Sequence, residues 1–257
     1  MMFDKILSLE NIAVAYGAKK ILHDITFSLK YGEILVIAGE SGSGKSTILK
    51  AIDGLLGKGG AITDGEIFFA GKEITILSDG QRRKHSGKEI GMIFQNAGAS
   101  FCPIRTIGEQ IFESVQAHRN WTEKEFRERA KIIMHNINLE ESALDEYPFR
   151  LSGGMAQRAG ILAAMILEPK LLLADEPTSA LDAVTQVGVV KELLKLRARH
   201  GISIVMVTHH MGVAWYLADK ILIMQGGRQV EFGTKEQIFN APQEIYTQEL
   251  IRAVPRL

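Results

Sequence analysis

The alternation of apolar and polar positions near the start of the chain predicts β-strands. Residues 6–15 and 21–29 alternate in this way, as strands with one buried face do. Residues 34–38 are continuously apolar, which is typical of a parallel strand buried on both faces. Two further segments, residues 65–70 and 90–94, also indicate strands. The N-terminal part is therefore predicted to be mainly β, with its first strands antiparallel.

A second pattern, strands alternating with helices, begins after residue 152. The predicted elements are helix 153–167, strand 171–174, helix 183–199, strand 203–207, helix 210–218 and strand 221–224. An earlier helix is predicted from residue 45 to about Leu56, where glycines 57–60 break it. Alternation at this spacing favours a parallel sheet covered by helices.

The segment between these parts, residues 97–150, is predicted to be mainly helical. Thr122 and Glu125 form a capping box for a helix whose apolar face comprises Phe126, Ala130, Ile133, Met134 and Ile137. We expect one α/β domain over residues 1–257. Its core, with the N-terminal antiparallel β region, comprises residues 1–96 and 151–257, and residues 97–150 form a helical subdomain insertion.

Composition narrows the class of protein. The 257 residues carry a formal net charge of +0, which argues against broad electrostatic binding to nucleic acid or anionic lipid. The single cysteine, Cys102, permits no disulfide within the chain. No apolar run approaches the roughly 20 residues of a membrane span, and residues 1–10 lack a signal-peptide core. We therefore expect a cytoplasmic protein whose membrane role, if any, depends on a partner.

Residues 39–47 match the phosphate-binding pattern G-x-x-x-x-G-K-S/T, between a buried strand and a helix. Glycines allow successive backbone N–H groups to surround phosphate oxygens, and the helix N-terminus adds partial positive charge. Lys45 can place its ammonium on the β- and γ-phosphates, and the Ser46 hydroxyl can ligate Mg²⁺. The pattern predicts a P-loop that binds nucleotide through Gly39, Ser41, Gly42, Ser43, Gly44, Lys45, Ser46 and Thr47.

The strand at residues 171–174 ends in two carboxylates, Asp175 and Glu176. In a P-loop protein this end of the strand lies beside the nucleotide, so Asp175 is the predicted Mg²⁺-side ligand. Glu176 would orient or deprotonate the attacking water. His209 and Gln95 also follow predicted strands, but a lone histidine or glutamine is more often structural or simply exposed.

Residues 151–158, Leu-Ser-Gly-Gly-Met-Ala-Gln-Arg, resemble the signature sequence of ABC ATPases. They form a second predicted helix N-terminus suited to a phosphate. The chain then has two phosphate-binding sites, the P-loop and this helix N-terminus. Two sites in one chain make sense if the second one contacts ATP that is bound to another cassette. The resemblance assigns nucleotide contacts to Ser152, Gly153, Gly154 and Gln157.

The resemblance extends over almost the whole chain and implies further roles. Tyr16 takes the position of an aromatic residue that stacks on adenine, and Gln95 that of a glutamine contacting Mg²⁺ or water. Residues 179–182, ending at Asp182, match the D-loop at the dimer interface, and His209 matches the switch histidine. The resemblance implies ATP and Mg²⁺ as ligands, with Lys45, Glu176 and His209 as the catalytic residues.

A narrower resemblance points to the subfamily for uptake of oligopeptides, dipeptides and nickel. It is carried by residues 95–96, 100–103, 147–148, Met155, 240–242 and 246–247. It implies two permease subunits, a second ATPase subunit in a heterodimer or a homodimer, and an extracytoplasmic solute-binding protein, with this chain at the cytoplasmic face of the membrane. Cargo by this resemblance includes peptides, nickel and metal–chelate complexes.

Three other readings remain open at this point. One is an ABC ATPase that acts on DNA or ribosomes, although this chain has one cassette, a short insertion and no basic excess. Another is an exporter ATPase, and a third is a regulatory cassette without turnover. Two departures from the family pattern are Cys102, where asparagine is common, and His210, where an acid is usual.

Overall fold

The computed structural model describes residues 4–82, 85–179 and 181–253. It divides into two structural units. The terminal unit combines residues 1–83 with residues 203–257, and the middle unit comprises residues 84–202. The terminal unit therefore brings the two ends of the sequence into one sheet.

The sheet of the terminal unit joins an antiparallel part to a parallel part. Its strands are β1 (Lys5–Tyr16), β2 (Lys19–Lys30), β3 (Ile34–Gly39), β4 (Gly60–Phe69), β5 (Lys72–Glu73), β8 (Ser203–Thr208), β9 (Lys220–Gln225) and β10 (Arg228–Thr234). Their order is β5-β4-β1-β2-β10-β9-β3-β8. β1 pairs antiparallel with β2 and β4, while β3 pairs parallel with β8 and β9. The predicted antiparallel N-terminal region and parallel core are thus confirmed.

The terminal unit also contains five helices within its described residues. They are α1 (Lys45–Asp53), α2 (Asp79–Arg82), α8 (Met211–Leu217), α9 (Lys235–Asn240) and α10 (Ile245–Arg252). Four of them, α1, α8, α9 and α10, contact the sheet. α1 contacts β2, β3 and β8, and α8 contacts β3, β8 and α9. β3 and β8 are buried at every position, as their apolar sequences require.

Several boundaries differ from the predicted ones. α1 ends at Asp53 rather than near Leu56, because Gly54 adopts a left-handed conformation (φ 77°) and its N–H bonds to the Lys50 carbonyl. β4 begins at Gly60, earlier than the predicted residue 65. β10, α9 and α10 were not predicted. They are short and partly exposed, so they carry no long apolar period.

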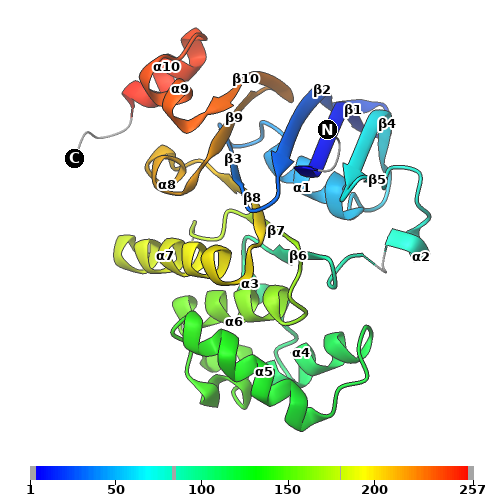
Figure 1. Ribbon diagram of the computed structural model, residues 1–257, viewed down its shortest axis with the longest axis vertical. Helices are drawn as coiled ribbons and strands as arrows, with labels where there is room; N and C mark the ends of the chain where they lie inside the picture. The colour runs from blue at the N-terminus through cyan, green and yellow to red at the C-terminus, as the bar shows by residue number, and fades with distance from the viewer. Residues whose placement is uncertain (1–3, 83–84, 180, 254–257) are drawn as a thin grey trace. The chain divides into compact units, whose positions relative to one another are not determined.

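The middle unit consists of helices around a pair of parallel strands, β6 (Ile90–Ile93) and β7 (Leu171–Asp175). Its helices are α3 (Ala97–Ser100), α4 (Ile107–Gln116), α5 (Glu123–Asn136), α6 (Gly153–Met165) and α7 (Ala183–His200), with 3₁₀ turns at Glu141–Leu144 and Pro148–Arg150. α5 packs against α4, α6 and α7, and Figure 1 shows it beside α4 and α6. The predicted capping box at Thr122 and the buried face of α5 are both confirmed.

Among the helices within the described residues, none combines the length and the apolar character needed to cross a bilayer.

Candidate nucleotide site

The P-loop begins where the buried strand β3 ends and continues into α1. Gly39 has φ 147°, and a Cβ there would lie 2.1 Å from the Met224 carbonyl oxygen. Gly44, the N-cap of α1, has φ 93°, and its Cβ would lie 2.6 Å from Leu22 Cδ2. Both positions therefore require glycine, because a side chain would collide with the neighbouring strands and strain the backbone.

Two polar side chains of the loop are buried and point inward. Lys45 is only 4% exposed, and its Nζ donates to the carbonyl oxygens of Gly39 at 2.9 Å and Glu40 at 2.6 Å. The Ser43 hydroxyl is buried and has no hydrogen-bond partner among the described residues. A buried hydroxyl without a partner is costly, and a phosphate oxygen would satisfy it. The loop thus fits a nucleotide phosphate.

Two contacts from late in the sequence hold this loop. The N–H of Gly227, in the turn between β9 and β10, donates to the Ser43 carbonyl at 3.1 Å. The N–H of Glu40 donates to the hydroxyl oxygen of Tyr246, on α10, at 3.2 Å. Neither contact could be predicted from the sequence, because the Tyr246 contact joins residues 206 positions apart and neither contact belongs to a local pattern.

Tyr16 and His209 belong to the same unit as the P-loop. Tyr16 ends β1, and a Cβ at Gly60 would lie 2.8 Å from its ring, so glycine makes room for the ring. His209 is exposed after β8, and its ring centroid lies 4.1 Å from that of His210. The backbone N–H of His210 donates to Thr208 Oγ1 at 3.0 Å. An imidazole therefore packs on His209 where the family usually has an acid.

In the middle unit the structure brings Gln95 and Glu176 together. β6 and β7 are parallel neighbours, so the residues following them share one edge. Gln95 Nε2 donates to Glu176 Oε2 at 3.2 Å. Asp175 is only 6% exposed at the end of β7. The arrangement places an amide donor on the carboxylate predicted to act as base.

The backbone of Glu176 is strained. Its φ is 43°, a left-handed value that is uncommon for a residue with a side chain. The backbone N–H and the hydroxyl of Ser179 each donate to the Glu176 carbonyl at 3.1 Å. Strain of this kind persists only where the surroundings enforce it, and it is concentrated at functional sites.

The signature segment is a helix N-terminus, as predicted. Ser152 is the N-cap of α6, and its hydroxyl accepts the Met155 N–H at 3.3 Å. A Cβ at Gly153 would meet no atom within 4 Å, so this first turn is open. Gln157 is buried, and its Nε2 has no hydrogen-bond partner among the described residues. The segment therefore has the geometry for a phosphate, and the nucleotide contact of Gln157 stays a prediction.

Asp182 caps the next helix. Its carboxylate accepts the N–H groups of Val184 and Thr185 at 3.0 Å and the Thr185 hydroxyl at 2.6 Å. The Thr185 hydroxyl is the main cause of a pKa below the usual aspartate range. Ala180, which completes the predicted D-loop, lies outside the described residues.

A buried ion pair joins the signature helix α6 to α7. Arg158 Nη2 lies 3.0 Å from Oε1 of Glu192, which is 1% exposed. Arg158 Nε and Asn138 Nδ2 donate to the same carboxylate at 3.0 and 3.1 Å. Because Arg158 follows the signature glycines by one turn, this pair fixes the orientation of the helix that carries them.

A cavity of about 470 Å³ lies beside Gln95 in the middle unit. Its lining is largely apolar and includes Phe101, Pro103, Phe149 and Gln157. The Phe149 side chain is 70% exposed and stacks on Tyr147 with ring centroids 5.6 Å apart. Exposed aromatic side chains beside a hollow are typical of a protein-binding surface.

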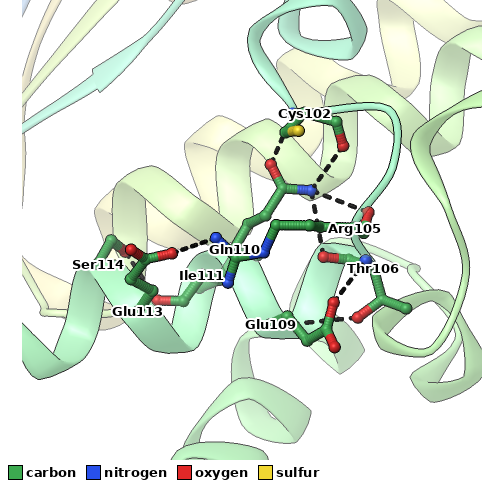
Figure 2. Close-up of polar contacts among 8 residues, drawn as sticks. All are labelled: Cys102, Arg105, Thr106, Glu109, Gln110, Ile111, Glu113 and Ser114. Carbon is green, nitrogen blue, oxygen red and sulfur yellow. Dashed lines mark hydrogen bonds and ion pairs between the residues drawn. The ribbon is translucent and has the colours of Figure 1, made fainter.

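The side chain of Gln110 bonds at several points to the loop beside this cavity (Figure 2). Its Oε1 accepts the Cys102 N–H at 2.7 Å, and its Nε2 donates to the carbonyls of Cys102 at 3.1 Å and Arg105 at 3.0 Å. The contacts of Cys102 are thus made by its backbone, and its thiol is exposed. No sequence motif marks Gln110 for this role.

The predicted site residues thus fall into two groups. Those in the terminal unit are Tyr16, Gly39, Ser41, Gly42, Ser43, Gly44, Lys45, Ser46, Thr47 and His209. Those in the middle unit are Gln95, Ser152, Gly153, Gly154, Gln157, Asp175, Glu176 and Asp182. Their individual roles stay predictions.

Comparison with known proteins identifies relatives over nearly the full chain. The model of the ABC transporter family matches residues 22–179. The dipeptide transport ATP-binding protein DppD of Escherichia coli strain K12 is 38% identical, over 97% of this chain and 78% of its own. The metal-staphylopine import system ATP-binding protein CntD of Staphylococcus aureus is 37% identical, over 90% of this chain and 86% of its own.

Two solved structures are also similar to this chain. A dimeric ATP-binding cassette in a post-hydrolysis state bound to ADP and Pi has a TM-score of 0.80 at 29% identity, covering 89% of this chain and 98% of the other. The protein cbiO1 of Clostridium perfringens, part of the transporter complex cbiONQ, has a TM-score of 0.81 at 28% identity, covering 93% and 92%.

Proposed function

Because this chain belongs to the ABC transporter family, we propose that it drives uptake of peptides, nickel or metal–chelate complexes through partner permeases. The chain is an ATPase of that family, with ATP as substrate and Mg²⁺ as the usual partner ion. The proposed cargo class rests on importer relatives that match 90–97% of the chain. The comparisons do not favour a role in DNA repair, translation or export.

The observation that carries the ATPase chemistry is the P-loop, with its buried Lys45 and unsatisfied Ser43 hydroxyl. Lys45 binds the β- and γ-phosphates, and Ser46 is the protein ligand that the loop offers to Mg²⁺. Bound Mg²⁺ neutralises charge that develops on the phosphates. Asp175 is the second proposed Mg²⁺-side ligand, and Gln95 contacts the ion or water. Tyr16 stacks on adenine.

Hydrolysis needs a water oxygen to attack the γ-phosphorus while the bond to the β–γ bridging oxygen breaks. Glu176 takes a proton from that water, and the products are ADP and inorganic phosphate. His209 steadies the charge that builds on the γ-phosphate. Ser152 and its following glycines serve the nucleotide of a second cassette, and Asp182 lies at that interface.

Permease docking is proposed at the cavity beside Gln95. Its apolar lining and the exposed ring of Phe149 suit a short apolar segment of a membrane subunit. Because Gln95 lines this cavity and bonds to Glu176, the docked segment can influence the carboxylate of Glu176.

The remaining proposed partners are a second ATPase subunit and an extracytoplasmic solute-binding protein. The chain as a whole is proposed to act as one ATPase domain, peripheral at the cytoplasmic face of the membrane.

Purification from native membranes in mild detergent tests this function. Mass spectrometry should identify two permeases and a second cassette with the chain, and the assembly should hydrolyse ATP. The Glu176→Gln chain should recover the same partners, with turnover lower by orders of magnitude. Recovery with ribosomal or DNA-repair proteins instead would contradict the transport function and leave the ATPase chemistry in place.

A further inference from the structure

Tyr246 connects the C-terminal helix α10 to the first peptide of the P-loop. Its hydroxyl oxygen accepts the N–H of Glu40, at 3.2 Å, immediately after Gly39. That N–H lies outside the regular pairing of β3, which ends at Gly39, and before α1, which begins at Lys45. The tyrosine therefore satisfies a backbone donor for which no strand or helix provides an acceptor.

The helix that carries the tyrosine is anchored around its first residues. The Glu231 carboxylate, on β10, accepts the N–H groups of Gln243 at 2.9 Å and Glu244 at 3.2 Å, just before α10 begins. Thr247, the residue after Tyr246, is fully buried. Burial also raises the pKa of Tyr246, so its hydroxyl stays neutral at neutral pH. A well-anchored side chain loses little entropy when it holds the loop.

The main chain of Glu40 makes another contact, through its carbonyl, and bound nucleotide would compete with that contact. Its carbonyl accepts Lys45 Nζ at 2.6 Å, yet the proposed function requires the same ammonium on the phosphates. When nucleotide recruits Lys45, the carbonyl of Glu40 loses this donor. The bond from the Glu40 N–H to Tyr246 involves no group that phosphate needs, so it can persist.

We propose that Tyr246 is a positioning residue that holds the start of the P-loop ready for ATP and thereby raises the affinity for nucleotide. This inference rests on the proposed function of the P-loop. The tyrosine touches neither nucleotide nor water in this scheme. Its effect should therefore appear in ATP binding and not in the chemical step.

The test replaces Tyr246 by phenylalanine, which keeps the ring and removes only the hydroxyl. The dissociation constant of Mg-ATP should rise about 2- to 10-fold, the range for one hydrogen bond. Turnover at saturating ATP and the melting temperature without nucleotide should match wild type. Tyr216→Phe is the matched control, because that tyrosine is 53% exposed on α8, and it should bind ATP normally.

A second variant reaches the same bond indirectly. Glu231→Ala removes the anchor of α10 without touching the hydroxyl, so it should also weaken Mg-ATP binding.

Unchanged affinity in Tyr246→Phe would overturn the proposal, and so would a lower melting temperature with unchanged affinity. Lys45→Ala tests the P-loop separately. If Lys45→Ala binds ATP like wild type, the proposed function is wrong. If Lys45→Ala loses ATP binding while Tyr246→Phe binds ATP like wild type, only the proposed role of Tyr246 is wrong.

Discussion

Gln95 Nε2 donates to Glu176 Oε2 at 3.2 Å, so two site residues that lie 81 positions apart share one hydrogen bond. The amide of Gln95 thereby helps to hold the carboxylate of Glu176 in one orientation. Because Gln95 also lines the cavity proposed for the permease, the orientation of the base can depend on what occupies that cavity.

Replacing Glu176 by glutamine should separate binding from hydrolysis. The amide keeps the size of the side chain and can still accept the Gln95 bond, but it cannot take a proton from water. Turnover should fall about 10²- to 10⁴-fold while the ATP dissociation constant stays unchanged. Phosphate release and equilibrium binding measure the two quantities. Turnover near wild type would remove Glu176 from its assigned role.

Replacing Gln95 by alanine should have a smaller effect on the same step. The carboxylate of Glu176 loses one orienting donor, which corresponds to a reduction in turnover of about 2- to 10-fold at saturating ATP. Gln116→Ala is the control, because Gln116 is exposed at the end of α4. If both variants hydrolyse ATP at the wild-type rate, the contact does not orient the base.

Much of the fold could be predicted because its signals are local. β3 and β8 are uninterrupted apolar runs, and the capping box of α5 lies within four residues. The P-loop could be located for the same reason, since its glycines precede the helix they cap. In each case a short stretch of sequence contains the whole physical cause.

The contacts that support these elements could not be predicted in the same way. The bond from Glu40 to Tyr246 depends on α10, a short helix with no long apolar period, and on its anchor at Glu231. The bond between Gln95 and Glu176 follows from β6 lying next to β7, which alternation alone does not specify. Tertiary pairing decides both contacts, so no local stretch of sequence specifies them.

The buried pair of Arg158 and Glu192 should matter for stability. Glu192→Ala leaves the guanidinium without its main partner, and breaking a buried pair costs about 3–5 kcal/mol. Because Arg158 remains partly exposed, the lower end of that range is expected. Urea unfolding measures the loss, with exposed Glu128→Ala as control. The double variant with Arg158→Ala should lose less than the sum of the two single variants. Additive losses would mean that the pair does not stabilise the middle unit.

The cap of α7 should make stability depend on pH through Asp182. Hydrogen bonds, first of all from the Thr185 hydroxyl, lower the pKa of this carboxyl in the folded state. Its contribution is therefore complete above the unfolded pKa of about 3.9 and is lost as pH falls through the lower, folded value. Asp182→Ala should be less stable than wild type at pH 7, and the difference should shrink towards pH 2. Urea unfolding across this range measures it, and a difference that stays constant with pH would show that the charged cap contributes nothing.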